Sequence, residues 1–294
     1  MIRAAIAGAT GYAGAELVRI LAAHPGVEIT ALTSRQFAGQ RFDRIFPALA
    51  GRVDRVCEDL ADDRIGAGAD VVFTALPHKM PMAVAPGILG RGCRLIDLSA
   101  DFRFNDAAVY AAAYQPHTAS GLLAEAVYGL SEVYAREIGG ARLVGNPGCY
   151  PTSVLLPLIP LLRAGLIDAE GILVDSKSGV SGAGRSPSLT AHFCEVNESF
   201  KAYKVAAHRH QPEMETYAGL AAGGPVRLSF VPHLVPMTRG MLSTIYARPR
   251  PGTTAGAIRD CLEAFYAGRP FIRLKPDGMP PDTLHVRGTN FCDI

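Results

Sequence analysis

The sequence lacks the features of several protein classes. Its six cysteines form neither a CxxC pair nor a CxxC arrangement with histidines, which argues against a zinc site and against a disulfide framework. No apolar run reaches the roughly 18 uninterrupted residues that span a bilayer. The chain also turns rich in glycine before the apolar core of a signal peptide forms. We therefore expect a cytoplasmic protein with no metal and no membrane partner.

Charge and length favour an ordinary globular protein with two domains. Lys and Arg together number 29 against 27 for Asp and Glu, which leaves a net charge of +2. This is far from the basic excess that binding to a nucleic acid backbone requires, so we expect no nucleic acid partner. The 294 residues are 49% hydrophobic, enough for a large core, and a chain of this length favours two domains over one.

The first half of the chain predicts an α/β fold with a Rossmann-type, doubly wound parallel sheet. Apolar runs that predict strands occupy residues 2–7, 27–32, 69–75 and 93–98, and polar or Gly/Pro-rich residues follow each run. Helical spacing of apolar residues over 16–23 separates the first two runs. Strands that alternate with helical segments are typical of doubly wound sheets.

The second half predicts an α+β domain with a largely antiparallel sheet. Its predicted elements are helices over 152–164 and 255–266 and strands over 172–176, 226–231 and 241–247. The pattern changes after residue 145, and we place the boundary between domains of residues 1–148 and 149–294.

The turn after the first predicted strand indicates a nucleotide site. Its glycines follow the pattern G-x-x-G-x-x-G and lead directly into the first predicted helix. Glycine there lets the backbone approach a pyrophosphate, whose charge interacts with the N–H groups at the helix N-terminus. Ordinary turns also need glycine, so the strand–turn–helix placement carries the prediction. We expect cofactor contacts from Gly8, Thr10, Gly11, Tyr12, Ala13 and Gly14.

The end of the second predicted strand indicates which dinucleotide binds. A free ribose 2'-hydroxyl favours Asp or Glu there, whereas this chain has Thr33, Ser34 and Arg35. Hydroxyls and a guanidinium suit a 2'-phosphate, so we predict NADP(H), with Ser34 and Arg35 as its ligands. The alternative is that Arg35 is a solvated loop residue.

The segment GNPGCYPT over residues 145–152 places one cysteine between a strand end and a helix. Pro151 stands where the first turn of a helix tolerates proline, so Cys149 should lie at the helix N-terminus. There the helix dipole favours the nucleophilic thiolate. Backbone N–H groups and the Asn146 amide are candidates to hold a developing oxyanion. The alternative is a buried structural thiol.

The segment HRHQPE over residues 208–213 is the richest source of an acid–base group. His208 and His210 have side chains that titrate near neutrality, and Glu213 could orient an imidazole from the first turn of a following helix. A purely structural loop and a metal site are the alternatives. Against the metal site, the chain has no Cys or carboxylate near these histidines at the spacing of a zinc site.

Three further loops carry candidate ligands for anions. Residues 178–185 form a glycine-rich stretch that ends in an arginine, residues 232–240 contain Arg239 and His233, and residues 99–103 follow a predicted strand. Each could also be an ordinary loop, with Asp101 and Arg103 pairing with each other. We predict substrate contacts from Arg103, Ser178, Arg185 and Arg239, and cofactor contacts from Ser181 and Gly182.

Several segments together resemble the motif series of N-acetyl-gamma-glutamyl-phosphate reductases, the third enzymes of arginine biosynthesis. They run in order along the chain as GATGYAGAEL, ALPH, DLSADFR, YGLSE, GNPGCYPT, SGVSGAGR, AYKVAAHRHQPE, PHLVPMTRGM and GTNFC. The GNPGCYPT and HRHQPE blocks are far more specific than a glycine pattern.

The resemblance implies an NADP(H)-binding Rossmann domain and a catalytic domain like that of glyceraldehyde-3-phosphate and aspartate-semialdehyde dehydrogenases, usually in a homo-oligomer. It implies that Cys149 is the nucleophile and that His208 or His210, of which we favour His210, is the acid–base residue. The residues that it implies near the cofactor are Gly11, Ser34, Arg35 and Pro77.

The function implied is NADPH-dependent reduction of N-acetyl-L-glutamyl 5-phosphate to N-acetyl-L-glutamate 5-semialdehyde and phosphate through a cysteine thioester. The alternatives are the same chemistry on an aspartyl or aminoadipyl phosphate and a catalytically silent nucleotide-binding protein. Two departures from the family pattern stand out. Ser131 replaces a usual Pro, and the chain stops at Ile294, before the final strand and helix that family members usually have.

Overall fold

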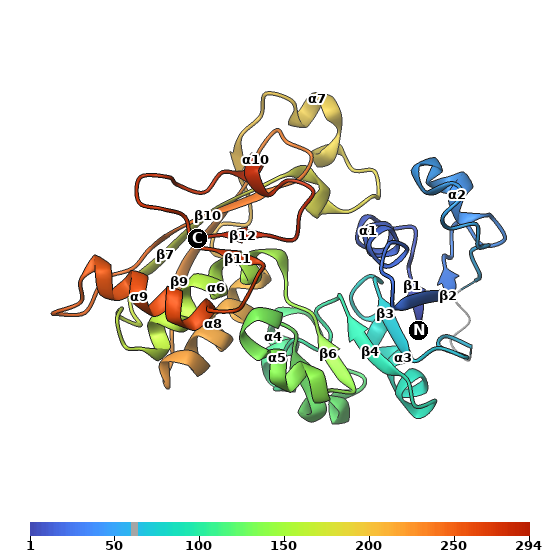
Figure 1. Cartoon of the computed structure of the whole chain (residues 1–294), viewed down its shortest axis with the longest axis horizontal. Helices are drawn as coiled ribbons and strands as arrows, with labels where there is room; N and C mark the ends of the chain where they lie inside the picture. The colour runs from blue at the N-terminus through green and yellow to red at the C-terminus, as the bar shows by residue number, and fades with distance from the viewer. Residues whose placement is uncertain (60–63) are drawn as a thin grey trace. The chain divides into compact units, whose positions relative to one another are not determined.

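A computed structural model describes residues 1–59 and 64–294 of the chain (Figure 1). The chain divides into two compact units, Met1–Pro147 and Gly148–Ile294. Among the described residues, no helix combines the length and the apolar character needed to cross a bilayer.

The first unit contains a six-stranded parallel sheet with the order β2-β1-β3-β4-β6-β5. This confirms the predicted parallel sheet. Because β2 and β3 lie on opposite sides of β1, the loops after β1 and β3 flank the point where the strand order reverses, which is where doubly wound sheets bind ligands. The strands are β1 (Ile2–Ala7), β2 (Val27–Thr33), β3 (Val71–Thr74), β4 (Arg94–Asp97), β5 (Ala126–Tyr128) and β6 (Leu143–Gly145).

Helices pack on both faces of this sheet. Alternate residues of β1 therefore belong to two different buried clusters. Ala4 and Ile6 join one buried cluster that includes Val18, whereas Ala5 and Ala7 join another that includes Ile88. The first cluster is closed by α1 and the second by α3. The helices of the unit are α1 (Tyr12–Leu21), α2 (Phe42–Ile45), α3 (Met80–Gly90), α4 (Ala107–Ala113) and α5 (Ser131–Gly140), with 3-10 turns η1 (Pro47–Leu49) and η2 (Ser120–Glu125).

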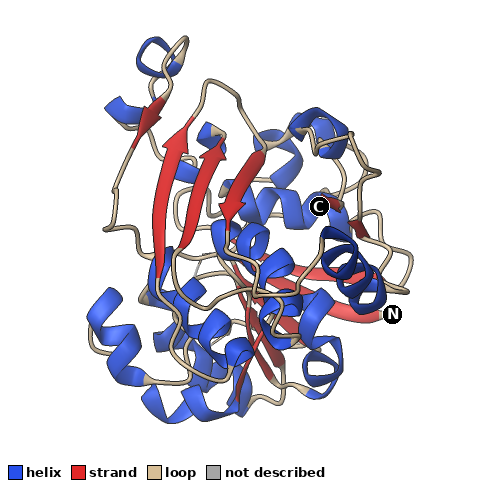
Figure 2. Cartoon of the chain, turned by 90° about the vertical axis from the view of Figure 1, so that its left-hand side faces the viewer, coloured by secondary structure: helices blue, strands red, loops and turns tan. Residues whose placement is uncertain are grey.

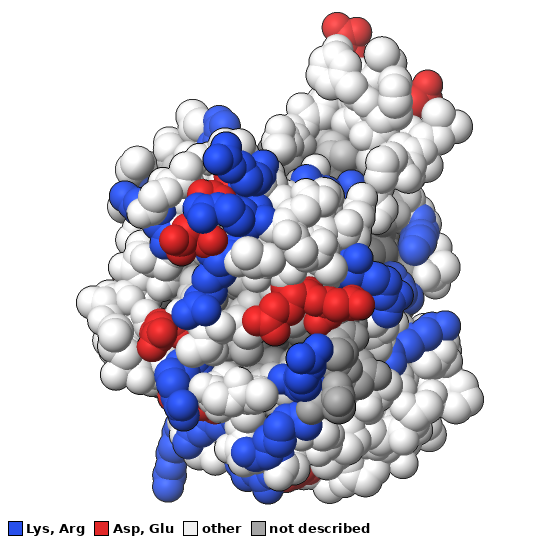
Figure 3. Space-filling view, turned by 90° about the vertical axis from the view of Figure 1, so that its right-hand side faces the viewer, with Lys and Arg blue, Asp and Glu red and all other residues white. Residues whose placement is uncertain are grey.

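Charges of both signs are mixed on the surface of this unit. Exposed pairs include Arg3 with Asp70 at 2.7 Å and Arg55 with Glu28 at 3.6 Å. On the face drawn in Figure 3, Lys and Arg side chains likewise lie among Asp and Glu side chains. Such mixing agrees with the small net charge of the chain.

The second unit contains a four-stranded sheet with the order β10-β7-β9-β8 (Figure 2). The outer pairings, β10 with β7 and β8 with β9, are antiparallel, but the central pairing of β7 with β9 is parallel. The prediction of a largely antiparallel sheet is therefore corrected to a mixed sheet. The strands are β7 (Ile172–Ser178), β8 (Lys201–Ala202), β9 (Leu228–Leu234) and β10 (Met241–Tyr246), and a separate pair is formed by β11 (Ile272–Arg273) and β12 (Cys292–Asp293).

One face of this sheet is covered by helices and the other is open. On the covered face, Ser243 of β10 hydrogen-bonds to both Ser176 of β7 and Ser153 of α6. The alternate residues of the open face include Leu173 and Tyr246, which are 49% and 57% exposed. The helices are α6 (Cys149–Arg163), α7 (Phe193–Val196), α8 (His210–Ala222), α9 (Ala255–Tyr266) and α10 (Thr283–Val286), with 3-10 turns η3 (Val180–Ala183) and η4 (Leu189–Ala191).

Helix α6 contains three prolines, two of them in its interior, and α9 compensates for one of these two. Pro160 has no N–H to donate to the carbonyl of Leu156, one turn earlier. The Tyr266 hydroxyl of α9 donates to that carbonyl instead. This bond satisfies a buried acceptor and ties α9 to α6, which carries the candidate nucleophile at its first residue.

Candidate active site

The glycine turn of the first unit is shaped by close backbone contacts. Gly8 has φ of +82°, and a Cβ on it would lie 2.5 Å from the carbonyl oxygen of Ala75. A Cβ on Gly14 would lie 2.3 Å from the oxygen of Gly8, so any side chain would displace the start of α1 from the turn. Gly11 is the N-cap of α1, whose first turn has no acidic residue. An anion that binds at this turn would therefore meet a helix N-terminus with no carboxylate in its first turn to repel it.

The predicted ligands around this turn differ in exposure. Tyr12 and Ala13 are exposed at the first turn of α1, and Pro77 is exposed after β3. The Ser34 hydroxyl, by contrast, is buried, hydrogen-bonds to the Thr10 hydroxyl at 2.7 Å and accepts from the N–H of Phe37.

Arg35 is exposed directly after Ser34, at the end of the second strand. Its guanidinium is thus available to a phosphate, whereas the neighbouring hydroxyls of Thr10 and Ser34 already hold the turn and the β2 loop together. Of the two residues predicted to bind the 2'-phosphate, Arg35 is the better placed.

Asp97, the last residue of β4, and Asp101, in the loop that follows, are fully buried carboxylates that accept hydrogen bonds from neighbouring groups. Asp101 accepts hydrogen bonds from the N–H groups of Lys79 and Met82, which open α3, and from the Tyr110 hydroxyl. Lys79 adopts the left-handed conformation with φ of 82°, held by this carboxylate. Asp97 accepts from the hydroxyls of Thr74 and Ser99 at 2.7 and 2.6 Å.

Burial dominates the ionisation of Asp97. Desolvation raises the pKa of its carboxyl to about 6, although the hydrogen bonds from Ser99 and Thr74 act in the opposite direction. The negative charge of Asp101 adds to the increase. The sequence pointed to the Asp101 loop but not to Asp97, because the sequence does not show how deeply an acidic residue at a strand end is buried.

Arg103 makes structural contacts, and its predicted contact with the substrate stays a prediction. It is 5% exposed, and its guanidinium donates to the carbonyls of Asn146 and Leu98 at 2.7 and 3.0 Å. The alternative, a pairing of Arg103 with Asp101, is not seen, because Asp101 binds the first residues of α3. Arg103 therefore fixes the backbone of the GNPGC segment, while the Asn146 amide donates to the carbonyl of Pro147.

Cys149 is exposed and is the first residue of α6, with Gly148 as the N-cap. The predicted placement of this cysteine at a helix N-terminus is confirmed, and the helix begins three residues earlier than predicted. Glu213, fully buried in the first turn of α8, accepts the N–H of Gly148 at 2.9 Å. This bond holds the turn that presents Cys149, and the prediction that Glu213 orients an imidazole stays a prediction.

Both histidines of the HRH segment pack near Cys149, around the ring of the buried Tyr150. The ring centroid of Tyr150 lies 5.3 Å from that of His208 and 6.0 Å from that of His210, and the two imidazoles are 4.8 Å apart. The Tyr150 hydroxyl bonds to that of Tyr203 at 3.0 Å. Sequence analysis missed both tyrosines, because nothing in the sequence marks a tyrosine as a partner of the HRH segment.

His208 is neutral over the physiological range. Burial lowers the pKa of its imidazole to about 4, and the positive charges of Lys204 and Arg209 lower it further. Its Nδ1 atom accepts the backbone N–H of His210 at 3.1 Å. The neutral imidazole therefore carries its one N–H proton on Nε2.

The two other motif loops of the second unit are joined by backbone hydrogen bonds. Gly179 donates to the carbonyl of Gly240, Val180 to that of Met237, and Ser181 to that of Thr238. A Cβ on Gly179 would lie 2.9 Å from the carbonyl oxygen of Met237, so this contact needs glycine. The other candidates divide by exposure: Ser178 is buried, and Gly182, Arg185 and Arg239 are exposed.

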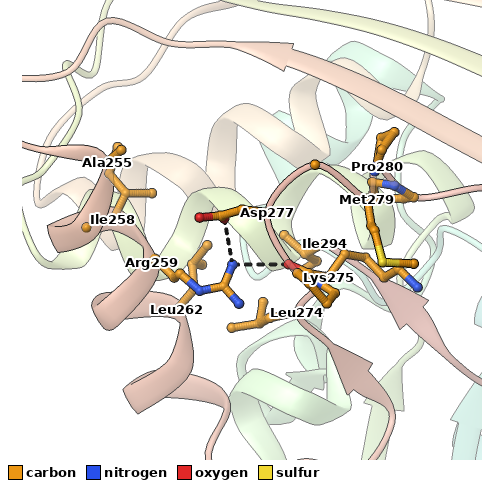
Figure 4. Close-up of a pocket in the computed structure, with 14 residues that line it drawn as sticks. Ala255, Ile258, Arg259, Leu262, Leu274, Lys275, Asp277, Met279, Pro280 and Ile294 are labelled. Carbon is orange, nitrogen blue, oxygen red and sulfur yellow. Dashed lines mark hydrogen bonds and ion pairs between the residues drawn. The ribbon is translucent and has the colours of Figure 1, made fainter.

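A hollow of about 560 Å³ elsewhere in the second unit contains none of the predicted site residues (Figure 4). The guanidinium of Arg259, which lines it, is held by the carboxylate of Asp277 and the carbonyl of Lys275, as the dashed lines in Figure 4 mark. In the part of the chain that the structure describes, no three His, Cys, Asp or Glu residues form a group that could hold a metal ion.

Two family descriptions match nearly the whole chain. The family described as "Semialdehyde dehydrogenase, NAD binding domain" matches residues 3–141, and the one described as "Semialdehyde dehydrogenase, dimerisation domain" matches residues 149–294. Solved structures of aspartate semialdehyde dehydrogenases share the fold. The enzyme with NADP from Candida albicans has a TM-score of 0.72 at 17% identity over 98% of this chain and 86% of its own.

Curated relatives are much more similar in sequence. The N-acetyl-gamma-glutamyl-phosphate reductase of Desulforapulum autotrophicum is 58% identical, and that of Syntrophobacter fumaroxidans is 54% identical. Both comparisons cover all of this chain and 85% of the relative. The motif series and the fold agree with this likeness, and the chain belongs to the family of N-acetyl-gamma-glutamyl-phosphate reductases.

Proposed function

We propose that this chain reduces N-acetyl-L-glutamyl 5-phosphate to N-acetyl-L-glutamate 5-semialdehyde and phosphate with NADPH, as a cytoplasmic enzyme of arginine biosynthesis. The observation that carries the proposal is an exposed cysteine at the first residue of α6, with two histidines packed against the next residue. Relatives that are 52–58% identical over the full chain bear the name of this activity.

The first unit fits a bound NADP(H). The turn has no room for side chains at Gly8 and Gly14 and leads through Gly11 into a helix N-terminus, which suits a pyrophosphate. No carboxylate follows β2, and the exposed Arg35 there suits a 2'-phosphate. When bound, the cofactor supplies the hydride that reduces the acyl group.

The chain's own residues provide covalent capture of the acyl group. The Cys149 sulfur attacks the acyl carbon, the bond from that carbon to the phosphate oxygen breaks, and phosphate leaves with its electron pair, so that a thioester remains. The N-terminal N–H groups of α6 stabilise the oxygen that becomes negative during the attack. After reduction, the hemithioacetal on Cys149 releases the aldehyde and regenerates the thiolate.

We assign the acid–base role to His210. A proton must move to and from the substrate oxygen as the hemithioacetal forms and collapses, and a group that titrates near neutral pH does this best. His208 stays neutral down to about pH 4 because of its burial, and its Nδ1 is engaged by the backbone of His210. His208 thus positions the loop, and His210 is the remaining imidazole of the segment.

The test compares two exposed cysteines of the second unit, Cys149 and Cys194. Cys149→Ser should lower turnover at least 1000-fold and leave NADPH binding unchanged, whereas Cys194→Ser should keep wild-type turnover. Iodoacetamide at pH 7 should label Cys149 faster than Cys194. Retained turnover in Cys149→Ser, or equal labelling rates, would contradict the proposed chemistry.

The substrate assignment has its own test in the reverse direction. Phosphate-dependent reduction of NADP should be at least 100-fold more efficient with N-acetylglutamate semialdehyde than with aspartate semialdehyde. A preference for aspartate semialdehyde would move the chain to a different acyl phosphate while leaving the role of Cys149 intact.

We also propose that the chain forms a homo-oligomer through the open face of the four-stranded sheet. Leu173, Leu242 and Tyr246 on this face are 37–57% exposed, and sheet faces of this kind commonly pack against another sheet. The matching family description for residues 149–294 names a dimerisation domain. Light scattering should give a mass of at least two chains at micromolar concentration.

A further inference from the structure

Tyr150, the residue after Cys149, lies at the centre of the aromatic cluster around the HRH segment. Its side chain is 2% exposed, and its ring contacts Phe230 of β9, at 5.1 Å between centroids, as well as both imidazoles. The rings of Phe230 and His208 are 5.4 Å apart. Because these rings are closely packed against one another, the orientation of Tyr150 and the position of the HRH segment depend on each other.

The hydroxyl groups of Tyr150 and Tyr203 are hydrogen-bonded to each other in this cluster, at 3.0 Å. A buried hydroxyl needs such a partner, because its removal from water without one is costly. Burial and the bond to Tyr203 raise the pKa of the Tyr150 hydroxyl well above its ordinary value, and burial also raises the pKa of Tyr203. Both hydroxyls therefore stay protonated over the pH range in which an ordinary histidine titrates.

Tyr203 is anchored in three ways just before the HRH segment. Its hydroxyl binds that of Tyr150, and its ring centroid lies 5.6 Å from that of His208. Its backbone N–H donates to the carbonyl of Pro232 in β9 at 3.0 Å. One residue thus joins the sheet, the residue after Cys149 and the HRH segment.

The link between Tyr203 and His208 has a strained backbone. It comprises residues 204–207, of which Lys204 and Ala206 adopt the left-handed conformation with φ of 44° and 53°. Such conformations persist where the surrounding structure holds them in place. The contacts of Tyr203 and His208 hold the two ends of the link. Release of the Tyr203 end would let the link relax and the imidazoles move.

The position of the imidazoles relative to the sulfur matters for the proposed reaction. Proton transfer needs a hydrogen-bond distance to the substrate oxygen, and that oxygen is bonded to the carbon that Cys149 attacks. The hydroxyl pair connects the residue after Cys149 to the anchor of the HRH segment, so it couples the two positions. A misplacement of about 1 Å can cost about 100-fold in rate.

We infer that Tyr150 and Tyr203 are positioning residues, whose hydroxyl pair sets the distance between Cys149 and the HRH segment. The inference rests on the proposed function, because it takes Cys149 as the nucleophile and His210 as the acid–base residue. Since both hydroxyls stay protonated, the tyrosines act through the imidazoles. Loss of either hydroxyl should slow the chemical step and leave the binding of the substrate unchanged.

The test removes the hydroxyls and keeps the rings with Tyr150→Phe, Tyr203→Phe and the double variant. Each single variant should lower kcat about tenfold while KM changes less than about twofold. The double variant should be no slower than the slower single one, because both changes break the same bond. Iodoacetamide should label Cys149 at the wild-type rate in all three, since the start of α6 stays intact.

Tyr266→Phe is the matched control. Like Tyr150, Tyr266 is buried in the second unit and its hydroxyl is hydrogen-bonded, but the acceptor is the carbonyl of Leu156. This variant should lower the melting temperature at least as much as the single variants and keep wild-type kcat and KM. An equal fall of kcat in all the Phe variants would point to lost stability and would overturn the inference.

Two further results would overturn it. One is wild-type kcat in Tyr203→Phe, and the other is a double variant whose loss is the product of the two single losses. Both would leave the chemistry of Cys149 intact, whereas turnover that persists in Cys149→Ser would remove the proposed function itself. If circular dichroism shows that Tyr150→Phe is unfolded, Tyr203→Phe decides alone, because Tyr203 is only partly buried.

Discussion

Replacing Asp97 by Asn removes a carboxyl group that is fully buried at the end of β4 and carries a pKa of about 6. In the unfolded chain the same group has a pKa of 3.8. Because the folded value is the higher one, folding favours the protonated form, and ionisation of Asp97 weakens the folded state. The loss of stability begins as the pH rises past about 4 and is complete above about 7.

The size of this effect follows from the two pKa values. A difference of about two units corresponds to a loss of about 3 kcal/mol at high pH, taken as an order of magnitude for a buried group. Linkage places about 1.4 kcal/mol of that loss between pH 5 and pH 8. The Asn variant lacks this part of the pH dependence. A constant cost from its altered hydrogen bonds to Thr74 and Ser99 cancels when the two pH values are compared.

The measurement is urea unfolding followed by circular dichroism at pH 5 and pH 8. Relative to the wild type, Asp97→Asn should gain about 1.4 kcal/mol on going from pH 5 to pH 8. Asp70→Asn is the control, because Arg3 lowers the pKa of Asp70 to about 2 and its contribution is constant above pH 5. If the Asp97→Asn and wild-type stabilities change in parallel, the carboxyl is not held near pH 6 and the reasoning fails.

Three further substitutions test the site. Gly14→Ala should cost about 1–3 kcal/mol of stability and weaken NADPH binding at least tenfold, because its Cβ would strike the backbone at Gly8. Melting and cofactor titration check this, and wild-type values in both would contradict it. Arg35→Glu should raise the KM for NADPH about 10–100-fold and that for NADH much less, and equal effects on the two cofactors would remove the 2'-phosphate assignment. Glu213→Ala should cost about 1–3 kcal/mol in urea unfolding by leaving the N–H of Gly148 unpaired, and Glu213→Gln much less, since Gln keeps an acceptor.

Sequence periodicity predicted the long elements well and the short ones poorly. The strand over residues 2–7 and the helix over 255–266 match β1 and α9 to the residue, because each pairs a clear apolar pattern with a clear end. Helix α3 was missed because its exposed residues, which include Ala83 and Pro86, are as non-polar as its buried ones, so the sequence shows no amphipathic pattern there. Strands of two or three residues such as β8 exist only through their pairing partners.

The candidate site divides in the same way between local and distant causes. The position of Cys149 at a helix start follows from a few neighbouring residues, and proline and glycine mark it. The contacts of Glu213 with Gly148 and of Arg103 with Asn146 join residues 65 and 43 positions apart. No local pattern encodes such pairs. The burial that neutralises His208 likewise comes from the tertiary packing around it.

The bond from Tyr266 to the carbonyl of Leu156 has a consequence for how this chain can change in evolution. A residue other than proline at position 160 would donate its own N–H to that carbonyl. The hydroxyl at position 266 would then no longer be needed as the donor. A proline at position 160 without a hydroxyl at position 266 would instead leave the buried carbonyl of residue 156 without a hydrogen-bond donor. Natural selection should therefore act on the two positions as a pair, although they lie on different helices.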